Sequence, residues 1–84
     1  MNERMTLANL LRRKMLDYEF DTIAGFARFI GLTEKHLGDL LTGKQLNPGT
    51  QIRRRICKAL DIAPKVLDMA VRYSIHRGNV NADK

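Results

Sequence analysis

The side chains of greatest chemical interest in this 84-residue chain are cations gathered in one segment. Residues 44–58 contain no acidic residue and five basic ones: Lys44, Arg53, Arg54, Arg55 and Lys58. This is the strongest local charge bias in the sequence, and the whole chain has a formal net charge of +6. Such a balance favours a polyanionic partner, of which nucleic acid is the commonest.

Catalytic chemistry has no comparable basis. His36 and His76 stand far apart in the chain, and neither has a cysteine or carboxylate at the spacing of metal ligands. There is no glycine-rich loop of the kind that cradles phosphates. The single cysteine, Cys57, follows Ile56 in a helical pattern, where a buried thiol is expected rather than a nucleophile. We therefore expect no enzyme and no metal, cofactor or small-molecule ligand.

Length and composition are those of one small globular domain. Apolar residues make up 44% of the chain, which is enough for a core. No apolar run approaches the length of a membrane span, and residues 1–13 lack the core of a signal peptide. One cysteine excludes an internal disulfide and suits a reducing compartment. We expect a cytoplasmic domain over residues 1–78, followed by a flexible tail at 79–84.

Two short helices joined by a tight turn organise the rest of the chain. Residues 22–30 repeat apolar side chains at helical spacing, and Gly31 suits a turn that needs a positive φ. Thr33 is placed to cap a second helix, whose apolar side is formed by Leu37, Leu40 and Leu41 and which Gly43 ends. This pattern predicts a helix-turn-helix.

Three further helices are expected to support this pair, at about residues 6–17, 48–60 and 64–77, and Gly78 is expected to stop the last of them. The predicted buried stripes of the five helices are Leu7, Leu10, Leu11 and Met15; Ile23, Phe26, Ala27 and Ile30; Leu37, Leu40 and Leu41; Ile52, Ile56, Ala59 and Leu60; and Val66, Leu67, Ala70, Val71, Ser74 and Ile75. The predicted fold class is all-α with five helices.

The spacing of these features resembles the lambda-repressor-like family of phage and bacterial regulators, also called the Xre or Cro/repressor family. The resemblance covers about residues 22–67, and the residues that carry it are Phe26-Ala27, Gly31-Leu32-Thr33, Leu37, Leu40, Gly43-Lys44, Pro48, residues 56–62 and Val66-Leu67. The chain departs from the family at Ile23, where glutamine is common. The family's arginine in the first helix has no clean counterpart, so Arg12, Arg13 or Lys14 either contacts a phosphate or forms a solvated basic face.

The resemblance implies that the second helix of the motif lies in the DNA major groove. The base contacts that it implies are Thr33, Glu34, Lys35, His36 and Asp39, and the phosphate contacts are Thr42, Lys44, Gln45, Asn47, Arg53 and Arg54. Lys35 would donate to guanine, and Glu34 or Asp39 would accept from cytosine. Alternatively, Glu34 only complements the helix dipole and His36 is an ordinary solvated residue. Arg55 is expected to be the structural member of the arginine run.

Two positions and one helix do not fit a core-only account. Phe29 and Leu41 fall where the family usually has polar residues, so either neighbouring helices cover them or they belong to an interface. The fifth helix extends beyond Leu67 with further apolar residues, and we expect a homodimer interface formed by Met69, Val71, Tyr73 and Ile75. The alternative is that this helix folds back over the first one.

These expectations describe a sequence-specific regulator of transcription that binds double-stranded DNA. The simplest form is a repressor that binds a two-fold symmetric operator as a homodimer. One alternative is a helix-turn-helix module that binds and inhibits another regulator or a host protein. Another is the antitoxin of a toxin pair, which would still bind its own promoter.

Overall fold

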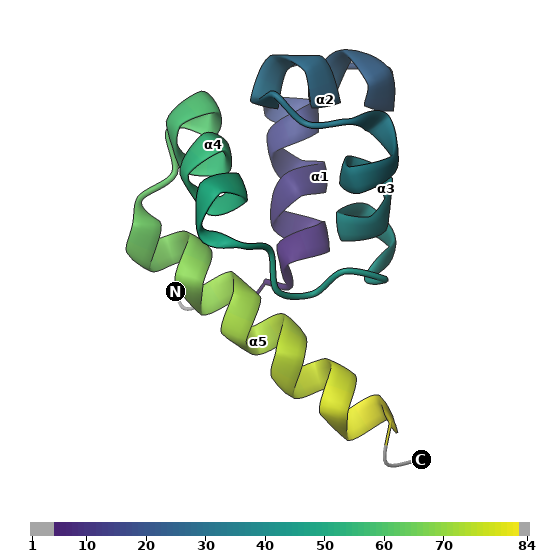
Figure 1. Ribbon diagram of the computed structural model, residues 1–84, viewed down its shortest axis with the longest axis vertical. Helices are drawn as coiled ribbons and strands as arrows, with labels where there is room; N and C mark the ends of the chain where they lie inside the picture. The colour runs from purple at the N-terminus through teal and green to yellow at the C-terminus, as the bar shows by residue number, and fades with distance from the viewer. Residues whose placement is uncertain (1–4, 83–84) are drawn as a thin grey trace.

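The computed structural model describes the backbone of residues 5–82 and the side chains of residues 5–76. The chain forms five helices: α1 (Leu7–Asp17), α2 (Ile23–Ile30), α3 (Glu34–Thr42), α4 (Thr50–Leu60) and α5 (Pro64–Ala82) (Figure 1). No strand is present between residues 5 and 82, so the predicted all-α class is confirmed.

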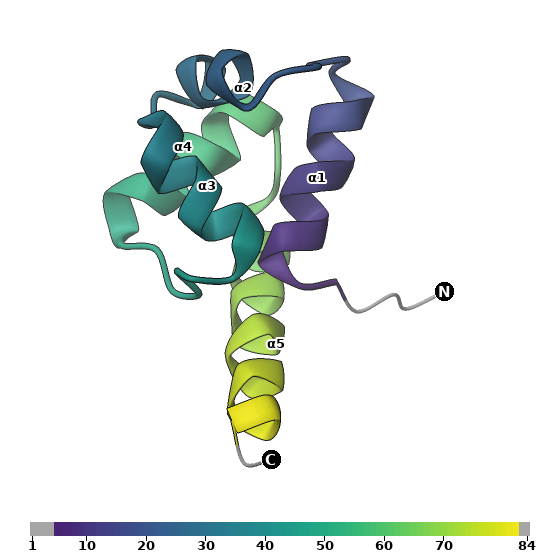
Figure 2. The same ribbon diagram turned by 90° about the vertical axis from the view of Figure 1, so that its right-hand side faces the viewer.

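The helices pack as a short bundle from which α5 projects. α1 lies against α3 and α5, α2 lies against α3 and α4, and α4 also contacts α5. Figure 2 shows the C-terminal part of α5 extending away from the other four helices. One end of α5 therefore belongs to the bundle, while the other end protrudes from it.

Threonine hydroxyls cap the first three helices, and the cap at Thr33 is the one predicted from the sequence above. Thr6, Thr22 and Thr33 each accept a hydrogen bond from the backbone N–H three residues later, at 3.2, 3.1 and 3.0 Å. Each bond satisfies one of the N–H groups that a helix start leaves unpaired. Gly31 and Gly43 follow α2 and α3 with φ of 93° and 82°, a left-handed conformation that favours glycine. Both predicted helix ends are confirmed.

All five helices contribute to one hydrophobic core. Its buried residues are Leu7, Leu10, Leu11, Phe26, Ala27, Ile30, Leu37, Leu40, Leu41, Ile56, Leu60, Ile62, Leu67, Ala70 and Val71. Two predicted core positions are wrong, because Ile23 is 39% exposed and Val66 is 50% exposed. Val66 precedes Leu67 by about 100° around the helix, so it lies outside the stripe that α5 turns toward the core. Ile23 is the first residue of α2, where no other helix covers it.

The predicted end of the last helix is also wrong. α5 continues through Gly78 to Ala82, so the expected tail at 79–84 is helical as far as residue 82, and residues 83–84 lie outside the described part. Glycine inside a helix costs only about 1 kcal/mol relative to alanine. It ends a helix only where the backbone then turns left-handed.

Candidate nucleic-acid interface

The turn between α2 and α3 fixes how α3 is presented. The N–H groups of Gly31 and Leu32 both donate to the carbonyl of Ala27 at 2.8 Å, which closes the last turn of α2. Thr33 then caps α3, and Leu37 packs in the core with no exposed surface. Because every leucine of α3 is buried, its outer face carries only polar residues and glycine.

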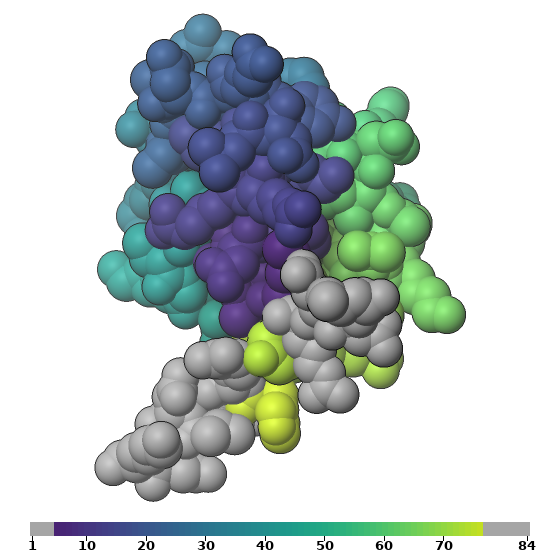
Figure 3. Space-filling model, turned by 180° about the vertical axis from the view of Figure 1, so that it is seen from behind, coloured from purple at the N-terminus to yellow at the C-terminus, as the bar shows by residue number. Residues whose placement is uncertain are grey.

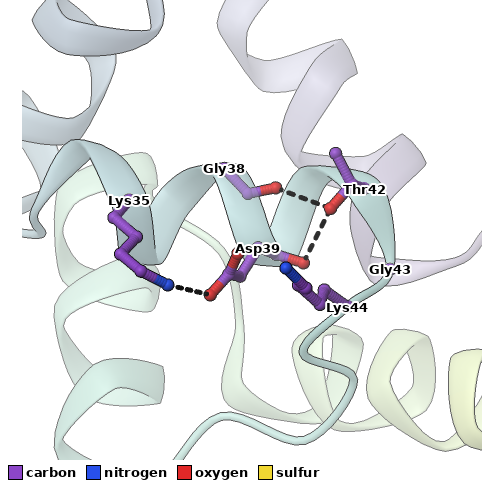
Figure 4. A pocket seen from close by; sticks show the side chains of 6 residues that line it. All are labelled: Lys35, Gly38, Asp39, Thr42, Gly43 and Lys44. Atoms are coloured by element: carbon purple, nitrogen blue, oxygen red, sulfur yellow. Dashed lines mark hydrogen bonds and ion pairs between the residues drawn. The ribbon is translucent and has the colours of Figure 1, made fainter.

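Two shallow depressions lie side by side on this outer face. One is lined by Thr33, Lys35, His36, Asp39 and Gln45. The other is lined by Lys35, Gly38, Asp39, Thr42, Gly43 and Lys44 (Figure 4). Since Lys35 and Asp39 line both, the two form one surface along α3 and the residues after it, which we call the α3 face. The structure thus brings together all the predicted base contacts except Glu34, which lies in the first turn of α3 outside both depressions.

Lys35 and Asp39 interact with each other across one helical turn. The Lys35 Nζ lies 3.4 Å from Asp39 Oδ2, and the lysine side chain is 84% exposed. An exposed pair at this spacing stabilises a helix by only about 0.3–0.5 kcal/mol. Lys35 can therefore exchange the carboxylate for a ligand atom at little cost.

The polar groups at the end of α3 are oriented by backbone contacts. The Thr42 hydroxyl donates to the carbonyl of Gly38 at 3.0 Å, so in this conformation it holds no proton for a phosphate oxygen. The backbone N–H of Gln45 donates to the carbonyl of Asp39 at 3.0 Å, and its side-chain amide donates to the carbonyl of Asn47 at 3.3 Å. Lys44, which lies between Thr42 and Gln45 in the chain, is exposed.

Arg53, a predicted phosphate contact, is engaged within the protein. Its guanidinium donates to the carbonyl of Pro48 at 3.0 Å, to Asn47 Oδ1 at 2.6 Å and to Asp68 Oδ1 at 3.2 Å. Through these three bonds, Arg53 of α4 is joined both to the loop that follows α3 and to α5. Arg53 and Asn47 are engaged with each other, so both are less free to reach a phosphate than the exposed Lys44 and Arg54.

The other arginines divide between structural and unpaired positions. Arg55 donates to the carbonyl of Gly31 at 2.8 Å, which confirms its predicted structural role, and Arg12 donates to the carbonyl of Leu41 at 3.0 Å. The sequence offered Arg12 as a phosphate contact or a solvated cation and did not predict this bond, because its acceptor lies 29 residues away in the chain. Arg54 is exposed and has no hydrogen-bond or ion-pair partner among the residues that the structure describes.

The predicted dimer interface on α5 requires correction at two positions. Val71 is 1% exposed and belongs to the core, and Ile75 packs against the core. The reason is that α5 turns this side toward α1, where the Ser74 hydroxyl accepts a bond from the N–H of Leu7 and donates to the carbonyl of Ala70. The alternative that α5 folds over α1 is thus confirmed for this side. Leu41 is likewise covered, being 4% exposed.

The exposed apolar side of α5 lies elsewhere. Val66 is 50% exposed and Met69 is 61% exposed, while Tyr73 is partly exposed. Positions 66, 69 and 73 follow the spacing of one helix face. We call these three residues the α5 face. Of the predicted interface residues, Met69 lies exposed on this face and Tyr73 is partly exposed, and Val66 joins them.

Cys57 has the environment of a structural residue. Its side chain is partly buried and packs against the core. Burial raises the pKa of the Cys57 thiol, and the positive charge of Arg53 opposes this rise only in part. A thiol of this kind is protonated at neutral pH and is a weak nucleophile.

Comparisons with protein families, with curated proteins and with solved structures give no match for this chain. No helix between residues 5 and 82 is long and apolar enough to cross a membrane. Within the same residues, no group of three or more histidine, cysteine or acidic side chains is placed to hold a metal ion.

Proposed function

We propose that this chain is a sequence-specific DNA-binding regulator of the lambda-repressor-like type, in which α2 and α3 form the helix-turn-helix. The observation that carries the proposal is the α3 face, where hydrogen-bonding side chains gather on a helix whose apolar side is wholly buried. The major groove admits one α-helix, and its base edges offer both donors and acceptors.

The α3 face supplies partners for both kinds of group. Lys35 donates to guanine O6 or N7, and Asp39 accepts from the amino group of cytosine. Thr33 and His36, at the start of α3, are held by the cap between them and meet the same groove. Glu34 then contributes mainly through the helix dipole.

The backbone of the DNA is held by fewer cations than the sequence predicts. Lys44 follows α3 directly and is exposed, and Gln45 is fixed beside it. Arg54 is the remaining cation of the arginine run with no partner of its own among the described residues. Contacts of this kind position the protein and make affinity depend on salt without reading sequence.

We further propose that two copies bind together through the α5 face. One recognition helix reads only a few base pairs, which recur too often in a genome to specify a site. A two-fold dimer reads two half-sites about 34 Å apart and is the commonest closed assembly. The simplest regulatory outcome is repression by occupying the operator.

The test is selection of bound sequences from a random pool of duplex DNA. A two-fold symmetric consensus is the expected result. Enrichment of no sequence would contradict the proposal and favour the alternative of a module that binds another protein.

A further inference from the structure

A stack of aromatic rings runs from the core to the surface where α1 meets α2. Phe26 has no exposed surface, and its ring centroid lies 5.4 Å from that of Phe20. Phe20 in turn lies 5.2 Å from Phe29, and Phe29 lies 5.6 Å from Tyr18. The outer two rings are accessible, since Tyr18 is 39% exposed and Phe29 is 45% exposed. Rings held in this way lose little conformational freedom on binding.

We call Tyr18 and Phe29 the aromatic corner. Exposed apolar residues in a group, rather than singly, mark sites of interaction.

The connector between α1 and α2 is locally acidic, whereas the flanking helices contribute Lys14 and Arg28. Asp17, Glu19 and Asp21 are all exposed, alternate with Tyr18 and Phe20, and have no ion-pair partner among the described residues. Three of the nine acidic residues of a chain with net charge +6 thus lie within five positions. An acidic rim repels nucleic acid and anionic lipid and attracts a cationic protein segment.

The backbone that forms the corner is strained. Glu19 has φ of 61°, where glycine is the usual residue after a helix. This turn directs the N–H of Phe20 to the carbonyl of Met15 at 2.9 Å and so returns Phe20 to the ring stack. Glycine would relieve the strain, but the chain has a carboxylate there.

We infer that the aromatic corner binds a second protein, through a segment that presents an apolar side chain flanked by lysine or arginine. The apolar side chain packs on Tyr18 and Phe29, and the flanking cations pair with Asp17, Glu19 and Asp21. This inference does not depend on DNA binding, because the corner and the α3 face share no residue. Figure 3 shows the end of α1 and the start of α2 on the upper rear face, with the teal α3–α4 region at its edge.

The first test is selection from a random peptide library displayed on phage, with the full chain as target. Peptides that combine basic residues with an apolar anchor are expected, and they should not bind a Tyr18→Ala, Phe29→Ala protein. No enrichment, or enrichment of peptides without cations, would overturn the inference.

The second test separates the corner from a general loss of fold. Changing Asp17→Asn, Glu19→Gln and Asp21→Asn leaves the core untouched and should weaken the binding of a selected peptide roughly tenfold, because three ion pairs with the peptide are lost. The effect should be largest at low salt, since salt screens exposed ion pairs. Asp61→Asn removes an exposed carboxylate at the end of α4 and should leave peptide affinity unchanged. Equal weakening by both variants would contradict the rim contacts.

A third measurement distinguishes a second copy as the occupant. Sedimentation of the wild type and of Phe29→Ala should give the same mass. If Phe29→Ala reduces self-association, the corner is a contact between copies and the inference is wrong. Both corner variants should still select the same DNA sequence as the wild type, so failure here and failure of DNA binding are distinct results.

Discussion

Several of the arginines donate to the protein's own backbone. Arg12 and Arg55 donate to the carbonyls of Leu41 and Gly31, which lie at the ends of α3 and α2. Arg53 donates to a loop carbonyl and to two side chains. Carbonyls at helix ends lack partners within the helix, and a guanidinium supplies several donors at once. The three guanidinium groups keep their positive charge, but they are already engaged by acceptors within the protein and are less free to contact a ligand directly.

We predict that Arg53→Ala lowers the free energy of unfolding by about 2 kcal/mol, because three hydrogen bonds are lost and the buried Pro48 carbonyl loses its donor. Urea denaturation followed by circular dichroism measures this change. Arg54→Ala is the matched control and should alter stability by less than about 0.5 kcal/mol. Equal effects of the two substitutions would show that the Arg53 bonds contribute little.

Arg54→Ala is predicted to act on DNA binding instead. Loss of one phosphate contact should weaken binding to all duplexes alike and reduce the slope of log affinity against log salt by about one unit. Titrations at several salt concentrations, with a selected site and a random duplex, measure both effects. An unchanged slope would place Arg54 away from the DNA.

Lys35→Ala is predicted to relax specificity at one base position, at a cost of about 1–3 kcal/mol for the preferred site. Asp39→Asn should do the reverse for random DNA, since it frees Lys35 from its 3.4 Å partner and removes a negative charge, and so should raise non-specific affinity. Competition between the selected site and random duplex measures both. Equal loss on both DNAs for Lys35→Ala would argue against base readout.

At the scale of the element, the end of α1 is the one helix terminus in the first half of the chain that lacks its preferred residue. α2 and α3 end at glycines, whereas α1 is followed by Glu19 at φ of 61°. We predict that Glu19→Gly raises the free energy of unfolding by about 0.5–1 kcal/mol. Left-handed backbone costs a residue with a Cβ about 1–2 kcal/mol, and the greater conformational entropy of glycine in the unfolded chain offsets part of this gain.

The control for Glu19→Gly is Asp21→Gly, two residues later, where φ is not positive. It should lower stability or leave it unchanged, and thermal unfolding compares the two. If the two glycines have the same effect, the strain at Glu19 is not what limits this turn.

At the scale of the whole molecule, one core supports three surfaces made of different residues. The α3 face, the aromatic corner and the α5 face each use side chains that the core does not bury. Because α1 contacts both α3 and α5, the proposed DNA and dimer surfaces are joined through packed helices. Arg53 adds a polar link, since it connects the loop after α3 with Asp68 of α5.

We predict that Val66→Glu with Met69→Glu converts a dimer to a folded monomer, because the two charges would be buried against a second copy. Sedimentation gives the mass, and titration with a symmetric DNA site should show weaker binding. Lys58→Glu changes the net charge equally on exposed α4 and should leave the mass unchanged. A wild type that is monomeric at micromolar concentration, or a double variant that stays dimeric, would contradict the α5 face.

Local patterns in the sequence were sufficient for the helices and most of the core. A cap at Thr33, a left-handed turn at Gly31 and an apolar repeat depend on residues within about one helical turn of each other, and all of these predictions are confirmed. The same reasoning assembled most of the α3 face, because neighbouring turns of one helix necessarily share a side. Its failure at Gly78 is also local in origin, since glycine permits an end to a helix without requiring one.

Only the tertiary structure decided which side of α5 is buried and which arginines donate hydrogen bonds within the protein. Val71 is covered because α5 packs against α1, where Leu7 and Ser74 meet across 67 positions of sequence. Arg53 donates a hydrogen bond to Asp68, which lies 15 positions away in the sequence. Contacts between residues so far apart in the sequence depend on how the helices pack. A hydrophobic repeat shows only that a residue is apolar, not which neighbour covers it.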